Sequence, residues 1–389
     1  MKKFFVRVIL SLLVFSMLLA VCGCWNRREL DTLGIVMGVG IDKTEKPGQI
    51  EMTAQIAKSS EMKTGKGGGG QGKAFVNVKA RGTDPLSIFR EYTHRINRFP
   101  YTSHNQIIIL GEDLAKEGIH DSLDFFLRSR ETRMTVSILV AKGKAGDVFE
   151  TEPELGKLSA AEIAQLIDTQ SESSETIQFT LMEYLSKIAC QCSIVTPIIE
   201  VKEESGKKVA YISSGAVFKK DKMVGELDKR ETRGLLWVLG KVKSGIISVP
   251  ADGKLAFIEI KKSDVKVDYE IKKDGNFLFN VKITEQGVMS SQTGYLDLIK
   301  PEELKVLEEA EQEEIKKAVE AALNKAKELD ADIFGFGEKI SKKDYKKWQS
   351  IKDNWDKQFK NLEVKIDVTA TIVGSGRLAK AVVPEKSGS

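Results

Sequence analysis

Apolar and polar residues alternate along several stretches of the chain, a pattern typical of β-strands with one buried face. The clearest examples are 265–271 and 277–283, where apolar residues stand between charged or polar ones. The segment 364–372 repeats the pattern near the C-terminus. Because only one side of such strands is apolar, we expect a sheet in the second half with one face in solvent.

The first half of the chain alternates predicted strands with predicted helices. We expect its strands at 34–42, 50–56, 75–78, 106–110, 134–141 and 194–201. The glycines of the first of these strands indicate that neighbouring groups pack closely against its backbone. The segments between several of these strands carry helical patterns or helix-start signals.

Three helix starts can be read from the sequence of this half. Pro85 after Asp84 is expected to open a helix. Ser159 with Glu162, and Thr180 with Glu183, have the spacing of capping boxes, in which each side chain bonds the other's backbone N–H. The residues expected on the buried face of the first helix are Leu86, Phe89, Thr93 and Ile96.

A long amphipathic helix is predicted from Pro301 to about Leu329. Glutamates fill its first turns, and Lys325 and Lys327 lie near its end, as the helix dipole favours. We therefore interpret the acidic run as a solvent-exposed face rather than a cation site. Its buried stripe is predicted to consist of Leu304, Leu307, Ile315, Ala318, Ala322, Ala326 and Leu329.

These elements predict an α+β protein with several domains, in which mixed or antiparallel sheets pack against helices. A chain of 389 residues is long enough for two or three domains. The polar segment 202–208 is the predicted boundary. We expect an N-terminal α+β part at 24–205 and a C-terminal α+β domain with the long helix at 206–389.

The first residues have the order of a bacterial lipoprotein signal. Lys2, Lys3 and Arg7 precede an apolar run at 8–21, which is short for a permanent membrane span. The run ends in Val-Cys-Gly-Cys, which resembles a lipobox, with a small residue directly before Cys24. We predict a signal peptide at 1–23 and lipidation of Cys24. An ordinary signal peptide or an uncleaved short anchor is the alternative.

Charge gives no argument for binding nucleic acid. The sequence holds 60 basic and 56 acidic residues, and three of the basic ones lie in the leader. The processed chain is therefore nearly neutral, which provides no general attraction to nucleic acid or to an anionic surface. No second apolar run is long enough to span a membrane.

A glycine-rich tract at 63–73 is predicted to be a flexible hairpin tip. Residues 67–73 match the first part of a phosphate-binding loop, G-x-x-x-x-G-K. Ala74 then stands where Ser or Thr would bind Mg²⁺, and a strand follows in place of a helix. Without a helix N-terminus there is no dipole aligned to hold phosphate, so we do not interpret the tract as a nucleotide site.

The cysteines and histidines provide no catalytic or metal signature. After processing, the cysteines left unmodified are Cys190 and Cys192, and no further ligands at metal-binding spacing accompany them. We expect buried free thiols there, with a strained disulfide as the alternative. The histidines, His94, His104 and His120, have no flanking catalytic motif. We therefore predict no catalytic residues, no metal site and no cofactor.

The mature N-terminus resembles that of the Ger(x)C spore germination lipoproteins. The resemblance begins with Cys-Trp-Asn-Arg-Arg-Glu-Leu at 24–30 and Gly-Ile-Asp-Lys at 40–43. It extends in order over nearly the whole mature chain, with Asn26 in place of an expected Asp and the glycine-rich tract as an insertion. Its other segments are 103–104, 107–115, 139–144, 214–218, 231–237 and 332–337.

The resemblance implies a non-catalytic C subunit of a nutrient germinant receptor. Such a subunit is expected on the outer face of the spore inner membrane, held by its lipid. Its expected partners are an integral-membrane A-type subunit and a transporter-like B-type subunit. The resemblance leaves open which nutrient is sensed and whether this subunit binds it directly.

Two other functions are compatible with an exported lipoprotein. A solute-binding lipoprotein of a transporter would alternate strands and helices across two lobes, whereas 265–283 reads as a meander. An extracellular hydrolase would need a metal or nucleophile signature, although paired carboxylates have no distinctive spacing. The receptor subunit remains the first hypothesis.

Overall fold

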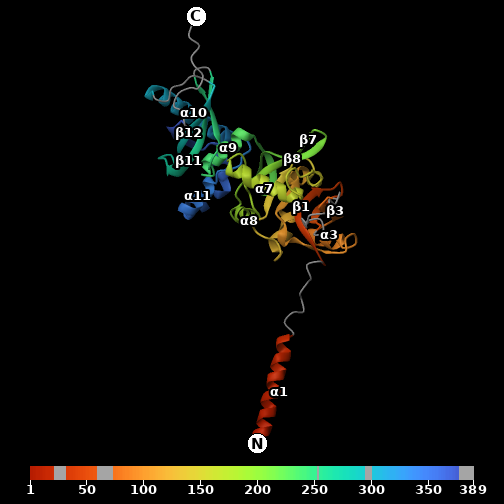
Figure 1. Cartoon of the computed structure of the whole chain (residues 1–389). Coiled ribbons are helices and arrows are strands. Elements are labelled where there is room, and N and C mark those ends of the chain that lie inside the picture. The colour runs from red at the N-terminus through yellow and green to blue at the C-terminus, as the bar shows by residue number, and fades with distance from the viewer. Residues whose placement is uncertain (22–31, 59–72, 252–253, 294–299, 376–389) are drawn as a thin grey trace.

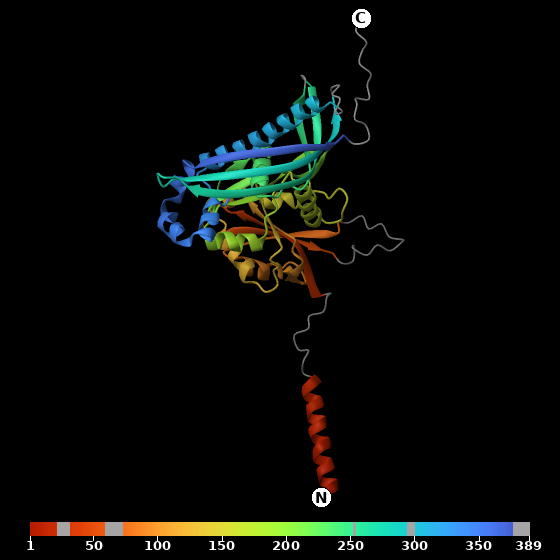
Figure 2. The same cartoon turned by 90° about the vertical axis from the view of Figure 1, so that its left-hand side faces the viewer.

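The computed structural model describes residues 1–21, 32–58, 73–251, 254–293 and 300–375. It begins with helix α1, Lys2–Val21. Within these ranges, no helix is long and apolar enough to cross a membrane. The body is an α+β fold in which two sheets pack with helices (Figures 1 and 2), as the sequence predicted.

The first sheet is mixed and has nine strands in the order β3-β2-β1-β5-β6-β7-β8-β9, with β4 paired to the start of β1. Its centre is parallel, because β1, β5, β6 and β7 run in the same direction. Both flanks are antiparallel. The strands are β1 Leu33–Lys43, β2 Ile50–Ala57, β3 Phe75–Gly82, β4 Phe99–Tyr101, β5 Ile107–Gly111, β6 Ser137–Ala141, β7 Ile194–Glu204, β8 Lys207–Lys219 and β9 Lys222–Leu227.

Helices cover both faces of this sheet, which explains why its central strands are apolar throughout. One face packs against α3 Pro85–Tyr92, α4 Glu112–Glu117, α5 His120–Arg128 and α8 Leu181–Cys190. The other face packs against α6 Ala145–Val148 and α7 Ser159–Glu172. A 3-10 turn, η3 Thr102–His104, leads into β5.

The second sheet has the order β10-β11-β12-β13, and its last pair is parallel. The long helix α10 contacts both edge strands, so it lies along one face of the sheet, as predicted (Figure 2). Helix α9 packs between α10 and the first sheet. The elements are α9 Lys229–Val238, β10 Ile246–Ala251, β11 Lys254–Ile271, β12 Phe277–Gln292, α10 Pro301–Glu328, α11 Phe336–Lys343, α12 Tyr345–Ile351, η4 Lys352–Asn354, α13 Trp355–Lys360 and β13 Glu363–Gly374.

Glycines allow two close approaches in this core. A Cβ added at Gly38 of β1 would lie 2.6 Å from the ring of Phe149, which confirms the expected close packing on that strand. A Cβ added at Gly234 of α9 would lie 1.9 Å from the carbonyl oxygen of Ala318. Helices α9 and α10 therefore meet backbone to backbone at Gly234.

The predicted boundary between 205 and 206 coincides with the turn of the β7–β8 hairpin. Strands β8 and β9, which follow that turn, belong to the first sheet. One apolar cluster also joins the two halves, because Val195 and Val217 of the first sheet share it with Phe279 of the second. The division into domains stays a prediction, and the first sheet takes residues from both sides of it.

Two local predictions in the first half are wrong. Helix α3 ends at Tyr92, so the predicted positions Thr93 and Ile96 lie outside it. Phe89 is buried as predicted, but Leu86 is 47% exposed and Ile88 is buried in its place. Ser159 is the first residue of α7 and bonds the carbonyl of Thr151, so it makes no capping box. The other predicted box is confirmed at the start of α8, where both of its hydrogen bonds form.

Candidate functional site

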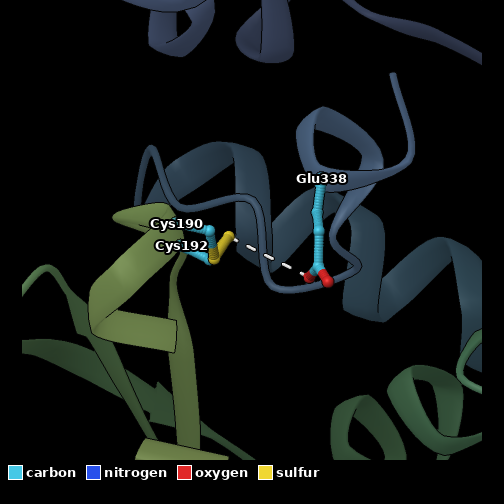
Figure 3. A group of neighbouring side chains, drawn as sticks. All are labelled: Cys190, Cys192 and Glu338. Atoms are coloured by element: carbon cyan, nitrogen blue, oxygen red, sulfur yellow. Dashed lines mark hydrogen bonds between the residues drawn. A yellow bond between two sulfur atoms is a disulfide. The ribbon is translucent and has the colours of Figure 1, made fainter. Parts of the chain in front are cut away.

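The C-terminal end of α8 meets α11 across the two halves of the chain (Figure 3). Lys187 of α8 donates a hydrogen bond to Glu338 of α11 at 2.8 Å. Lys342, one turn along α11, bonds the other carboxylate oxygen at 2.7 Å. Burial opposes ionisation of Glu338, but the two ammonium groups prevail and lower the pKa of its carboxyl. The site is an ion-pair contact that joins residues 151 positions apart.

Cys190 and Cys192 lie beside this contact and are joined by a disulfide. Both side chains are half-buried. The expectation of buried free thiols is therefore wrong. Gln191 between them adopts a left-handed backbone, with φ 55°, and this turn brings the two flanking cysteines to the same side. An exported protein can keep such a disulfide, because thiols oxidise outside the cytoplasm.

Cys190, Cys192 and Glu338 lie close enough together to be considered as metal ligands. The sulfur atoms and a carboxylate oxygen of Glu338 lie within 4.8 Å of one another. In the disulfide the two sulfurs are bonded to each other and offer no thiolate to a metal. Both oxygens of Glu338 are also held by lysines. The oxidised arrangement therefore does not fit a metal centre.

Two aspartates in the segments that resemble the Ger(x)C family hold backbone turns. Asp42, at the end of β1, accepts hydrogen bonds from the N–H groups of Ala145 and Gly146 at 2.7 and 2.9 Å. Its side chain is buried, and burial raises the pKa of its carboxyl despite these bonds. Asp42 thus fixes the start of α6 to the end of β1. This role is structural.

Asp332 plays the corresponding role in the second half. Its carboxylate accepts bonds from the N–H groups of Phe336 and Gly337 at 3.1 and 2.7 Å. The indole N–H of Trp355 donates a third bond at 3.0 Å. Asp332 therefore links the start of α11 to Trp355, the first residue of α13. The segment 332–337 belongs to the resemblance described above, but no pattern in the sequence indicates the role of the aspartate.

The histidines are exposed and lie at three separate places: His94 in the turn after α3, His104 in η3 and His120 at the start of α5. Other predicted features lie outside the described residues. These are the lipidation site at Cys24 and, except for Lys73, the glycine-rich tract at 63–73.

Two family models cover most of the chain. One, described as "Spore germination protein N-terminal domain", matches residues 26–201. The other, "Spore germination B3/ GerAC like, C-terminal", matches residues 213–376. The chain belongs to the Ger(x)C family. The resemblance in the sequence is thereby confirmed.

Several curated relatives from Bacillus subtilis (strain 168) match along nearly their full length. "Spore germination protein B3" is 28% identical over 94% of this chain and 98% of its own. "Putative spore germination protein YfkR" is 25% identical over 98% of this chain and all of its own. "Spore germination protein KC" is 26% identical over 94% of both chains.

A solved structure of this family has the same fold. The "Crystal Structure of the GerBC protein" aligns with a TM-score of 0.59 at 21% identity. The alignment covers 88% of this chain and 99% of that one. At this level of identity the likeness concerns the fold alone, and the α+β architecture read from the sequence agrees with it.

Proposed function

We propose that this Ger(x)C protein is a lipid-anchored, non-catalytic C subunit of a nutrient germinant receptor required for spore germination. The observation that carries the proposal is the lipobox ending at Cys24, followed by a chain that matches both family models in order. The names of the curated relatives support a role in spore germination. The two aspartates with the clearest hydrogen-bond roles serve the fold, which agrees with a role in contacts rather than catalysis.

The anchor follows from the chemistry of Cys24. A diacylglyceryl group on its thiol supplies two acyl chains, and burial contributes about 0.8 kcal/mol per CH₂ group. Two chains give lasting attachment where one gives only marginal binding. The body would then stand on the outer face of the spore inner membrane and contact the integral-membrane A-type and B-type subunits.

The test uses spores of the native host that carry Cys24→Ala. Nutrient-triggered release of dipicolinate is followed together with membrane fractionation of the protein. We expect the protein to leave the membrane fraction and the nutrient response to fall, while germination by non-nutrient agents continues. Normal responses to every nutrient from a chain that has left the membrane, in spores without a second receptor copy, would remove the main support for the proposal.

A further inference from the structure

The start of β1 marks the end of the body nearest to the predicted anchor. Leu33 is the first residue of the strand, and it pairs with Phe99 of β4. A Cβ added at Gly34 would lie 3.4 Å from Ile56 and 3.5 Å from the Cβ of Arg98. Residues near 56 and 98 therefore surround the point at which the chain enters the fold.

Basic side chains gather at this point. Lys58 follows the end of β2, and its N–H bonds the carbonyl of Ala74 at 2.8 Å, which places Lys73 beside it. Lys58, Lys73 and Arg95 are exposed, and Arg98 is half-buried. We call Lys58, Lys73, Arg95 and Arg98 the basic end.

A shallow pocket opens within the basic end. It holds about 200 Å³ and is lined by Lys58 and Arg98 together with Asn97 and an apolar wall that includes Ile56 and Ile96. Within the part of the chain that the structure describes, its lining holds no acidic side chain. Glu91, at the end of α3, lies 4.0 Å from His94. The pocket thus combines positive charge with an apolar floor, which suits an anionic group attached to an apolar one.

An exposed aromatic side chain completes the surface. Phe99 is 52% exposed although it lies in a strand. Aromatic rings are enriched where proteins meet the membrane–water interface. Its neighbour in sequence is Arg98, so the apolar ring and a positive charge share one edge of the body.

The chain between the anchor and this surface is short. Leu33 comes nine positions after Cys24, and even a fully extended chain of that length reaches only about 30 Å. A body tethered at Cys24 therefore keeps the start of β1 within roughly that distance of the bilayer.

We propose that the basic end rests on the membrane surface and binds the headgroups of anionic phospholipids. This inference rests on the proposed lipid anchor and adds an orientation to it, because the anchor alone would leave the body free to tumble. Each basic residue of a cluster close to an anionic membrane raises the equilibrium constant for binding the membrane about fivefold. The nearly neutral charge of the whole processed chain gives no such attraction, so the effect depends on this cluster.

The test uses the full-length lipidated protein in vesicles, with a fluorophore on a cysteine introduced by Asn97→Cys. The vesicles contain phosphatidylcholine alone or mixed with phosphatidylglycerol, and a spin-labelled lipid serves as quencher. A second protein carries the label through Tyr345→Cys, at an exposed residue of α12. Labelling of the native cysteines is measured on the parent chain and subtracted. We expect quenching at position 97, stronger with phosphatidylglycerol, and little at position 345.

Charge-reversal variants test whether the basic end is what holds the body on the vesicle surface. Lys58→Glu with Arg95→Glu is expected to lower docking by at least about fivefold for each residue changed, because each change removes a positive charge and adds a negative one. The loss should be smaller in high salt. Lys346→Glu with Lys352→Glu, a matched change at exposed residues of the second half, should leave quenching unaltered. Circular dichroism of each variant checks that the fold is kept.

Flotation of the same vesicles tests the anchor separately. A parent chain that does not float would contradict the proposed anchor itself. A parent chain that floats, but whose position 97 is quenched no more than position 345, overturns the orientation proposed here. Equal quenching with and without phosphatidylglycerol overturns the anionic lipid and points to a contact of another kind.

Discussion

Glu285 of β12 and Glu311 of α10 place two carboxyl groups against each other between the second sheet and the long helix. Their side chains are 2% and 0% exposed. The two carboxyl groups contact each other, and within the described residues no other group donates a hydrogen bond to their oxygens. Two ionised carboxylates in such contact would repel without compensation, so the pair is stable only when it holds a proton.

Burial raises the pKa of both groups, and for Glu285 repulsion from Glu311 raises it further. Glu308 adds to the negative charge from the same helix. A folded-state pKa above the unfolded value means that the folded state binds protons more tightly. The stability from this pair is therefore complete below the ordinary carboxyl pKa and is lost as the pH rises through the raised values.

Glu311→Gln should weaken this pH dependence, because the repulsion between two carboxylates is lost and the amide can donate a hydrogen bond to Glu285. Burial of Glu285 keeps the remaining part. We expect the variant to be more stable than the parent by about 1–3 kcal/mol at alkaline pH, and close to it in acid. Urea denaturation at several pH values measures the difference. Glu309→Gln, at an exposed neighbour, is the control. A parent-like loss of stability with pH in Glu311→Gln would contradict the shared proton.

Asp42→Asn should loosen the contact between β1 and α6. The amide nitrogen of Asn cannot accept a bond, so one of the two backbone N–H groups, of Ala145 or Gly146, loses its partner. A buried donor left unpaired costs about 1–3 kcal/mol. Thermal unfolding measures the loss, with the exposed Asp353→Asn as control. An unchanged midpoint would show that the clamp adds nothing to stability.

Gly234→Ala should push α9 away from α10. The added Cβ falls 1.9 Å from the carbonyl oxygen of Ala318, so one backbone must move. Overpacking of this kind costs about 1–3 kcal/mol. Gly34→Ala, whose nearest neighbour lies at 3.4 Å, should cost less. Equal denaturation midpoints for the two variants would contradict the close approach.

Replacing both Cys190 and Cys192 by Ser should have a modest effect. The disulfide closes a loop with a single intervening residue, for which the chain-entropy relation gives about 1–2 kcal/mol. Thiol titration of the denatured parent should find these two groups only after reduction. Two thiols titrated without reduction would mean that the disulfide does not form in the protein. Glu338→Gln, which keeps the disulfide, tests the neighbouring ion pair separately.

The periodic patterns predicted most of the strands and the long helix, because each of these elements has one clearly apolar face. Their failures are informative. Phe89 is buried as the helical spacing predicted, but Leu86 is exposed. The helix ends at Tyr92, and its buried face includes Ile88 and Tyr92. The spacing of Ser159 and Glu162 fits a capping box, but Glu162 binds the N–H groups of 154–156.

The carboxyl pair could have been found from the sequence. Glu285 continues the alternation of Phe279, Val281 and Ile283 onto the buried face. Glu311 fills the gap between Leu307 and Ile315 in the predicted stripe of α10. Each breaks an apolar pattern at a buried position. Their mutual contact could not be predicted, because it depends on how the helix lies on the sheet.

The β7–β8 hairpin has a consequence for how the protein is made. The chain is synthesised from its N-terminus, and β7 finds its antiparallel partner only in residues that follow the turn at 205–206. The first sheet is therefore incomplete until β9 has left the ribosome and, for an exported chain, the membrane channel. Until then β7 presents an unpaired edge, which favours pairing with other chains. Folding of the first sheet thus depends on residues up to Leu227, which follow the turn.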